Sequence, residues 1–305
     1  MKNNKIAILI PCYNEEATVK DVILEFKNAI PEAIIYVYDN NSSDETYSVA
    51  VEAGAIVRHE HRQGKGFVLQ RMFAEIEADV YLLVDGDLTY DPSVATKLVD
   101  AILYQSYDMS VGFRNEVESS AYRMGHKLGN KFLTGSVNKI FGESIKDMLS
   151  GYRALSRRFV KSFPLQSSGF EVETEITIHA LELKMRIIEI DSIYRPRPEG
   201  SESKLKTYSD GWKIILFIVN LFRQEKPLTF FLLISFFLAL ISIFIFIPVL
   251  FEYIDSGLVP RLPTAILSMG IMILSIISVA CGLILDTVTR GRKEIKQLSY
   301  LSYKN

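Results

Sequence analysis

Cysteine is scarce in this sequence of 305 residues: there are two, Cys12 and Cys281, far apart in the chain. They offer neither a disulfide framework nor a metal cluster, so a reducing cytosolic setting is the default expectation. A basic excess is also lacking, because 34 Lys and Arg residues face 36 Asp and Glu residues and the formal net charge is −2. Without that excess to pair with phosphates, the sequence does not favour a protein that holds nucleic acid electrostatically.

The N-terminus, Met1-Lys-Asn-Asn-Lys5, lacks an apolar signal region, so we expect the residues before 228 to stay in the cytoplasm. Charge is absent from two stretches of 24 residues, Leu228–Phe251 and Leu262–Leu285. At 1.5 Å per helical residue each extends about 36 Å, enough to cross a hydrocarbon core of about 30 Å. We therefore predict a transmembrane hairpin of two helices. The alternative is a pair of buried helices in a soluble core, which rarely run so long without a charge.

Flanking charges orient this hairpin. Cations lie before the first stretch and after the second: Arg223, Lys226, Arg290, Arg292, Lys293 and Lys296. The connecting loop has one, Arg261, so the positive-inside rule predicts that both chain ends are cytoplasmic. The predicted parts are a cytoplasmic domain (1–207), a juxtamembrane helix (208–227), two transmembrane helices (228–285) and a basic cytoplasmic tail (286–305). The juxtamembrane helix contains Trp212 and either lies in the membrane interface or packs under the soluble domain.

The N-terminal part alternates short apolar runs with segments of helical spacing, which predicts an α/β domain with a mostly parallel sheet covered by helices on both faces. The predicted strands are Lys5–Pro11, Ile34–Asp39, Ile56–His59, Val80–Val84 and Met109–Phe113. The predicted helices are Glu15–Ala29, Asp44–Ala53, Gly64–Glu77 and Pro92–Tyr104. Ligands of such sheets bind at the carboxyl ends of the strands.

Polar residues follow four of these strands. They are Pro11-Cys-Tyr-Asn-Glu-Glu16, Asp39-Asn-Asn-Ser-Ser-Asp44, Asp85-Gly-Asp87 and Gly112-Phe-Arg114. Gly86 lets the backbone turn so that two carboxylates, one residue apart, face the same ligand. Hard divalent cations take such oxygen ligands, and Mg²⁺ commonly bridges carboxylates to a substrate diphosphate. An isolated Asp-x-Asp is more often a turn, but its place after a buried strand favours a site.

These motifs resemble those of family 2 glycosyltransferases of the GT-A (Rossmann-like) fold, and more narrowly of the polyprenyl-phosphate glycosyltransferases. That group contains dolichol-phosphate mannose synthase and bacterial undecaprenyl-phosphate sugar transferases. The resemblance covers essentially the whole chain. Its further carriers are Gly64-Lys-Gly66, Asp147-Met-Leu-Ser-Gly-Tyr-Arg153 and Gly200-Ser-Glu-Ser-Lys-Leu205. The two-helix anchor also matches membrane-bound members.

The resemblance implies a nucleotide-diphosphate-sugar donor and Mg²⁺ or Mn²⁺ as cofactor. It implies these donor-binding residues: Pro11, Tyr13, Glu15, Asp39, Lys65 and Asp85. Asp85 and Asp87 are the implied metal ligands. Many dolichol-phosphate mannose synthases have a further glutamine ligand where this chain has Thr89, and this departure favours a UDP-sugar over GDP-mannose.

The implied acceptor is a polyprenyl monophosphate, which cations must position. The candidates are Arg114, Arg123, His126, Lys127, Arg153, Arg197 and Lys204. Arg123 and Lys127 share a helix face that is either an acceptor site or solvated. Catalytic roles are expected for Asp87, Arg114 and Asp147, with Asp147 as base, as orienting group or as a simple capping residue. Glu171, Glu173 and Glu175 offer one sugar contact or a solvated face, and His59 and His61 are expected on the surface.

The sequence thus predicts an inverting transfer of one sugar to a polyprenyl phosphate at the cytoplasmic face of a membrane, typical of a prokaryotic plasma membrane. The partners are the donor, the lipid acceptor, the bilayer and, by packing of the hairpin, further copies in a dimer or tetramer, without nucleic acid. One alternative is a processive polysaccharide synthase, but its Gln-x-x-Arg-Trp motif is absent, since the one tryptophan stands in Ser209-Asp-Gly-Trp212. The other is a non-catalytic nucleotide-sugar-binding protein tethered to the membrane.

Overall fold

The computed structural model describes residues 4–115, 124–142, 145–167, 169, 171–198 and 207–303. The chain divides into two compact units. The first comprises Met1–Gly211 together with Ile295–Asn305, and the second comprises Trp212–Glu294. The second unit is therefore an insertion in the sequence of the first.

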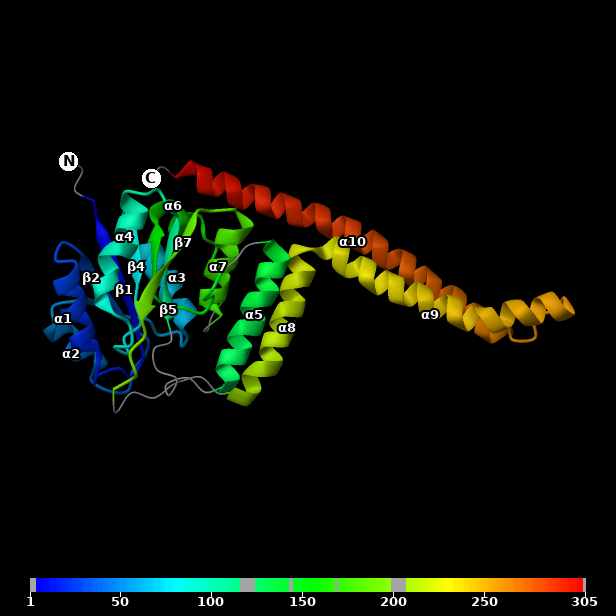
Figure 1. Cartoon of the computed structure of the whole chain (residues 1–305), viewed down its shortest axis with the longest axis horizontal. Helices are drawn as coiled ribbons and strands as arrows, with labels where there is room; N and C mark the ends of the chain where they lie inside the picture. Colours follow the sequence, from blue (N-terminus) through cyan, green and yellow to red (C-terminus); the bar gives the residue numbers. More distant parts are fainter. Residues whose placement is uncertain are drawn as a thin grey trace. The chain divides into compact units, whose positions relative to one another are not determined.

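The first unit is built on a seven-stranded sheet with the order β3-β2-β1-β4-β6-β5-β7. Figure 1 labels its strands β1, β2, β4, β5 and β7. Its strands are β1 (Ile6–Cys12), β2 (Ile34–Asp39), β3 (Ile56–His59), β4 (Val80–Leu83), β5 (Met109–Asn115), β6 (Arg153–Ser156) and β7 (Ile187–Ile193). Only β6 runs antiparallel to its neighbours, so the predicted mostly parallel sheet is confirmed. The five predicted strands are present, and β6 and β7 are additions to them.

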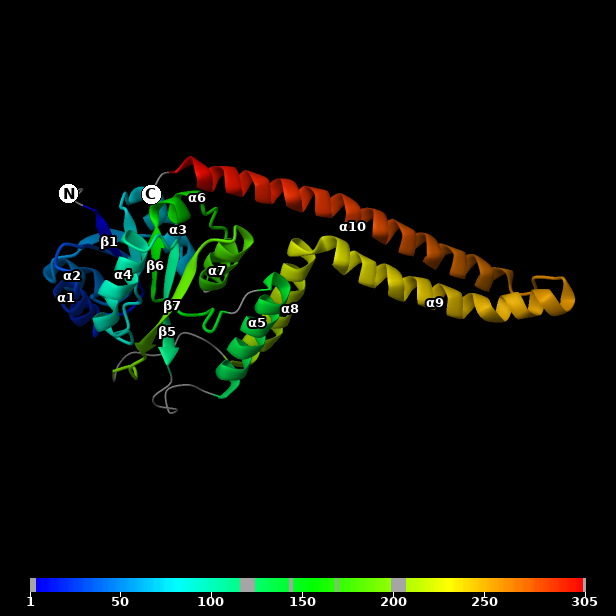
Figure 2. The ribbon, with the colours of Figure 1, turned by 45° about the horizontal axis from the view of Figure 1, so that its top comes forward.

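Helices cover both faces of this sheet (Figure 2). They are α1 (Val19–Ala29), α2 (Thr46–Glu52), α3 (Lys65–Glu75), the 3-10 turn η1 (Pro92–Val94), α4 (Ala95–Leu103), α6 (Arg157–Ser162) and α7 (Val172–Glu182). Helix α5 (Met124–Phe141) packs against α7. Alternate residues of β1 serve opposite layers: Ile8 packs in the core under α1, α2 and α4, and Leu9 in the core under α3, α6 and α7. This alternation is what a strand buried on both faces requires.

The strand register gathers polar residues at one edge of the sheet. Cys12 at the end of β1 pairs with Asp39 at the end of β2, and Leu9 pairs with Leu83, two residues before Asp85. Because β6 is antiparallel, its first residue, Arg153, lies opposite Leu83. The carboxyl ends of the parallel strands and the start of β6 therefore meet at the same edge.

The chain end returns to this unit. Helix α10 (Leu262–Ser302) continues through the residues predicted as a basic tail, and its last turns pack on the sheet domain. The Tyr300 hydroxyl donates to Asp108 Oδ2 at 2.9 Å, and Lys296 Nζ lies 2.6 Å from Glu182 Oε2. Asp108 is buried and also accepts a bidentate pair of hydrogen bonds from Arg158. The Arg158 guanidinium lies 4.7 Å from the Tyr300 ring centroid. These charged and aromatic contacts fix the tail on the domain.

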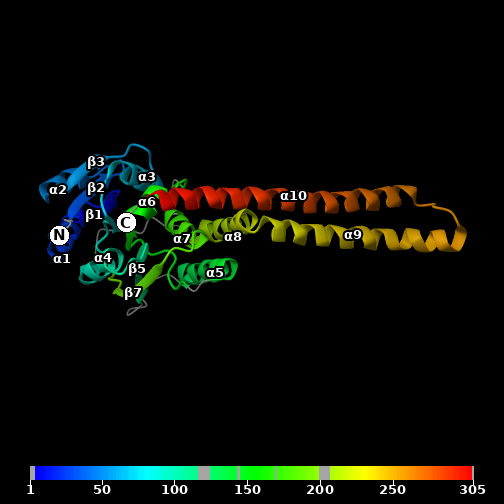
Figure 3. The same cartoon turned by 90° about the horizontal axis from the view of Figure 1, so that it is seen from above.

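The second unit is mainly a helical hairpin of α9 (Pro227–Ser256) and α10, which lie side by side (Figures 1 and 3). Both helices are long and apolar enough to cross a membrane, and their most apolar windows are only 11% and 17% buried. A core helix of a soluble domain would be mostly covered. Helix α8 (Thr207–Glu225) precedes them in the chain.

Small residues with a seven-residue spacing close this hairpin. Ser235 and Ser242 of α9 face Ser275 and Ser268 of α10. The hydroxyl oxygens of Ser235 and Ser275 lie 2.8 Å apart, and the Ser242 hydroxyl donates to the Ser268 carbonyl at 2.7 Å. In an apolar solvent, small side chains of this kind let helices approach closely while their hydroxyls stay hydrogen-bonded. Large apolar side chains, such as Phe244 at 78% exposure, are left on the outside.

Candidate active site

The turn after β4 presents Asp85 and Asp87 at the polar edge of the sheet. Glycine is required between them, because a Cβ at Gly86 would lie 2.8 Å from the Cys12 sulfur. The Thr18 hydroxyl donates to the Gly86 carbonyl at 2.6 Å and anchors the turn from α1. The turn is therefore held by packing and hydrogen bonding before any ligand binds.

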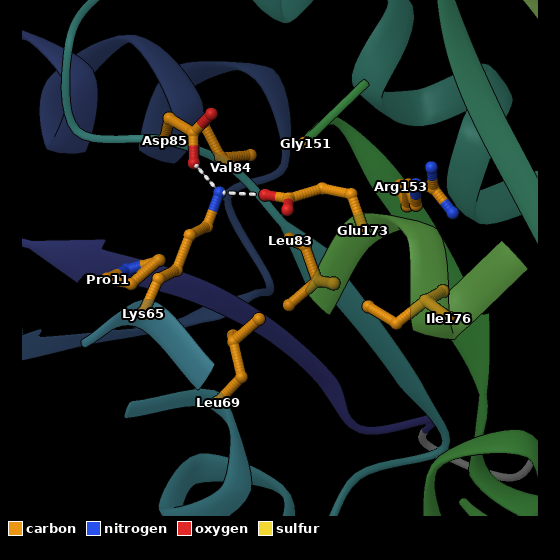
Figure 4. A pocket seen from close by; sticks show the side chains of 10 residues that line it. All are labelled: Pro11, Lys65, Leu69, Leu83, Val84, Asp85, Gly151, Arg153, Glu173 and Ile176. Carbon is orange, nitrogen blue, oxygen red and sulfur yellow. Dashed lines mark hydrogen bonds and ion pairs between the residues drawn. The ribbon is translucent and has the colours of Figure 1, made fainter. Parts of the chain in front are cut away.

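Asp85 is held by Lys65 and Tyr90 and is closely approached by the backbone at Gly151. Lys65 Nζ, at the start of α3, lies 2.5 Å from Asp85 Oδ1 and 2.5 Å from Glu173 Oε1 on α7 (Figure 4). The Tyr90 hydroxyl lies 3.5 Å from Asp85 Oδ2. A Cβ at Gly151 would come within 2.6 Å of that same oxygen, so the backbone before β6 approaches the carboxylate as only glycine can.

The ammonium of Lys65 remains charged in this setting. Burial alone lowers the pKa of an amine, but the adjacent carboxylates of Asp85 and Glu173 outweigh it and raise the pKa of Lys65 above its ordinary value. Lys65 is therefore a fixed positive charge in the wall of a pocket that Pro11, Asp85, Gly151 and Glu173 also line.

Asp87 lies deeper and has its own two partners. The Thr89 hydroxyl donates to Oδ1 at 2.6 Å, and the Arg197 guanidinium lies 2.7 Å from Oδ2. Burial, reinforced by the charge of Asp85, raises the pKa of Asp87. Thr89 stands where many dolichol-phosphate mannose synthases have a glutamine metal ligand. In this chain its hydroxyl orients Asp87.

The two carboxylates fit a hard divalent cation. They are oxygen ligands one residue apart, and each already holds a cationic group of the protein, Lys65 or Arg197. Among the described residues no three His, Cys, Asp or Glu side chains gather around one point. Asp85 and Asp87 would therefore supply two ligands, and an anionic ligand or water would supply others.

A second ion pair lies at the end of β5. Arg114 binds Asp147 in a bidentate manner, with Nε 2.6 Å from Oδ2 and a terminal nitrogen 2.8 Å from Oδ1. The Asp147 backbone N–H donates to Glu189 on β7 at 3.1 Å, and the Arg114 guanidinium lies 5.4 Å from the Tyr194 ring centroid. Asp147 is buried and locked in this pair, so it orients Arg114 beside the carboxylate turn.

The predicted nucleotide residues lie at the ends of β1 and β2. Glu15 and Asp39 are buried, whereas Tyr13 is 37% exposed. His59 and His61 are exposed as predicted, but His59 Nδ1 lies 3.0 Å from Asp39 Oδ2, because the register pairs the two residues across β2 and β3. Asn40 accepts from the Gly64 N–H at 2.7 Å and thereby fixes the start of α3, which carries Lys65.

One predicted acceptor ligand, Arg153, lies inside the protein. Arg153 is 1% exposed, and its guanidinium donates to the carbonyls of Ser150 and Met148 and to the Thr177 hydroxyl. These internal hydrogen bonds hold Arg153 in place, and it lines the pocket that Lys65 and Asp85 also line (Figure 4). Arg197 does lie at the site, whereas Arg123, Lys204 and the side chains of His126 and Lys127 lie outside the described residues.

Three functional neighbours were not among the predicted site residues: Glu173, Tyr90 and Tyr194. Glu173 belongs to the predicted triplet of glutamates, but spacing shows which residues share a face, not which face is buried. Glu173 is 7% exposed and holds Lys65, while Glu175 accepts hydrogen bonds from the backbone of Gln166 and Ser167. Tyr194 follows β7, the edge strand that the sequence analysis did not predict.

The sequence profile of glycosyl transferase family 2 matches residues 7–163, just over half of the chain. The chain is a family 2 glycosyltransferase. Glycosyltransferase AglJ of Haloferax volcanii is 33% identical over 228 residues, which cover 74% of this glycosyltransferase and 75% of AglJ. The dolichol-phosphate mannosyltransferase of Pyrococcus furiosus is 28% identical over 233 residues, covering 73% of this chain and 64% of that enzyme. A UDP-N-acetylglucosamine–dolichyl-phosphate N-acetylglucosaminyltransferase of Methanococcus voltae is 28% identical over 216 residues, which cover 62% of this chain and 85% of that enzyme.

Solved structures show the same fold. Glucosyl-3-phosphoglycerate synthase of Mycobacterium tuberculosis, in complex with phosphoglyceric acid, superposes with a TM-score of 0.59 at 21% identity, covering 71% of this glycosyltransferase and 79% of that chain. The same synthase with Mn²⁺ and UDP-glucose gives a TM-score of 0.57 at 22% identity, and the match covers 73% of this chain and 79% of the synthase. The predicted GT-A fold is confirmed.

The internal hydrogen bonds of Arg153 predict a stability effect. Arg153→Met keeps the apolar volume but leaves buried carbonyl groups without donors, so we expect the free energy of unfolding to fall by about 2–4 kcal/mol. Denaturant unfolding measures it. Arg157→Met is the matched control, because Arg157 pairs on the surface with Glu77, and this change should cost less than about 1 kcal/mol. Wild-type stability of Arg153→Met would contradict the structural role.

Proposed function

We propose that this glycosyltransferase moves one sugar, with inversion, from a nucleotide-diphosphate sugar to a polyprenyl monophosphate at the cytoplasmic face of a membrane. The observation that carries the proposal is the meeting of the Asp85/Asp87 pair with Lys65, Arg114 and Arg197 at one edge of the sheet. The apolar hairpin supports a lipid acceptor, and so does the similarity to a dolichol-phosphate mannosyltransferase and a dolichyl-phosphate N-acetylglucosaminyltransferase.

The donor half of the site is assigned to the carboxylate turn. Asp85 and Asp87 would hold Mg²⁺ or Mn²⁺, and such an ion, when bound, stabilises the charge that develops on the departing diphosphate. Lys65 neutralises the diphosphate from α3, and the residues at the ends of β1 and β2 hold the nucleoside: Pro11, Tyr13, Glu15 and Asp39. Thr89 in place of glutamine favours a UDP-sugar over GDP-mannose.

The acceptor half needs cations rather than a strong base. The second pKa of a phosphomonoester is about 6, so the acceptor is largely a dianion at neutral pH. Its oxygen attacks the anomeric carbon opposite the leaving group. The new carbon–oxygen bond forms as the bond to the diphosphate breaks, and the nucleoside diphosphate departs. No proton has to be removed, which fits an Asp147 that orients Arg114 and is not itself free to act as base.

The hairpin supplies the membrane attachment in this proposal. Both chain ends and the catalytic domain lie in the cytoplasm, as the flanking cations predict. The large apolar side chains on the outside of α9 and α10 face lipid or further copies in a dimer or tetramer. The lipid-linked sugar is then available for use on the other side of the membrane.

Transfer of label tests the proposal directly. Membranes containing the protein are incubated with Mg²⁺, undecaprenyl phosphate and a panel of labelled UDP-sugars and GDP-mannose, and the organic extract is counted. We expect lipid-soluble label with one UDP-sugar. Asp87→Asn should reduce it by at least about 10²-fold because a metal ligand is lost, and Asp100→Asn, the same change on α4, should not. Absence of label with every donor would refute the proposed function.

Asp147→Asn separates orientation from base catalysis. An amide cannot keep the bidentate charged pair, so the freed Arg114 should raise the acceptor KM about tenfold, worth about 1.4 kcal/mol, while kcat stays within about threefold. Steady-state kinetics at several acceptor concentrations and pH values measure both. If kcat instead falls by about 10²–10⁴ and no longer declines at low pH, Asp147 is the base.

A further inference from the structure

Each oxygen of the carboxylate pair has a partner from the protein itself. Lys65 is on Asp85 Oδ1 at 2.5 Å, and the Tyr90 hydroxyl lies 3.5 Å from Oδ2. On Asp87, Thr89 donates to Oδ1 at 2.6 Å and Arg197 lies 2.7 Å from Oδ2. Each carboxylate is thus already paired with one positively charged side chain, Lys65 on Asp85 and Arg197 on Asp87, before any ligand arrives.

We propose that Lys65 and Arg197 are built-in counter-ions that prevent the carboxylate pair from binding a divalent cation alone, so that the cation enters together with the nucleotide diphosphate. This inference rests on the proposed function, in which the pair binds a metal and a nucleotide donor. A cation that reaches Asp85 Oδ1 or Asp87 Oδ2 must displace a like charge, and in a partly buried site that repulsion is poorly screened. The negative charge of a diphosphate compensates for it.

Glu173 makes the displacement of Lys65 possible. It is 7% exposed on the first turn of α7, and its Oε1 lies 2.5 Å from Lys65 Nζ. When Asp85 turns to the metal, Lys65 still has this carboxylate and gains the diphosphate oxygens. Glu173 is therefore a positioning residue, which keeps the ammonium in the pocket during the exchange.

Arg197 lies on the open side of the pair. Its side chain is 31% exposed, whereas that of Asp87 is 6% exposed, so the guanidinium covers a buried carboxylate from the solvent side. If a metal bound Asp87, Arg197 would lose this contact at the edge of the sheet where Arg114, the last residue but one of β5, also lies.

Binding of Mn²⁺ to the full-length protein in detergent tests the inference without any sugar transfer. Electron paramagnetic resonance counts free and bound Mn²⁺, with and without UDP. We expect the wild-type protein to bind Mn²⁺ at least tenfold more tightly when UDP is present. Arg197→Gln and, independently, Lys65→Gln should each bind Mn²⁺ alone at least tenfold more tightly than the wild type does.

Arg195→Gln is the matched control, because it removes the same charge two residues away from Arg197, where it pairs with Glu25 and Asp91. Its affinity for Mn²⁺ should stay within about twofold of the wild type. The inference is overturned if Mn²⁺ binds the wild type equally well without UDP, or if neither Arg197→Gln nor Lys65→Gln gains affinity. Those results leave sugar transfer untouched. Absence of bound Mn²⁺ in every variant, even with UDP, would contradict the metal site of the proposed function as well.

Discussion

Charge compensation at one edge of the sheet is the constraint on which the site depends. Gly86 allows Asp85 and Asp87 to stand one residue apart in a partly desolvated turn, where two carboxylates are costly without matching cations. The cations come from distant parts of the chain: Lys65 begins α3, and Arg197 follows β7. The sheet topology brings these charges together, because the parallel strands end at this edge and β6 begins there.

Neighbouring polar side chains hold these cations, and Arg114, in place. Asn40 holds the start of α3, Glu173 holds Lys65 from α7, and Asp147 holds Arg114 in a bidentate pair. At the far end of α7, Glu182 pairs with Lys296 of the returning tail. The helix that carries Glu173 is therefore anchored at both of its ends.

Much of this fold follows from the sequence, because strands buried on both faces are short, apolar and bounded by turn residues. That signal predicted β1 to β5 and the residues after them. It did not predict β6, which has four residues and opens with Arg153, or β7, where Glu189 and Asp191 interrupt the apolar pattern. Arg153 is buried because carbonyl groups of the preceding turn accept its hydrogen bonds, and Glu173 is buried because it contacts Lys65 of α3. The spacing of residues along the sequence predicts neither contact. The end of α10 was predicted as a basic tail because charge alone does not reveal that Tyr300 reaches the buried Asp108.

A structure of the protein with Mn²⁺ and UDP bound tests the central claim most directly. The decisive measurement is the separation of Arg197 from Asp87, which is 2.7 Å here, together with that of Lys65 from Asp85 and Glu173. We predict that Arg197 leaves Asp87 and that Lys65 exchanges Asp85 for the diphosphate while it keeps Glu173. A metal ion bound to Asp85 and Asp87 with both cations still in their present places would contradict it.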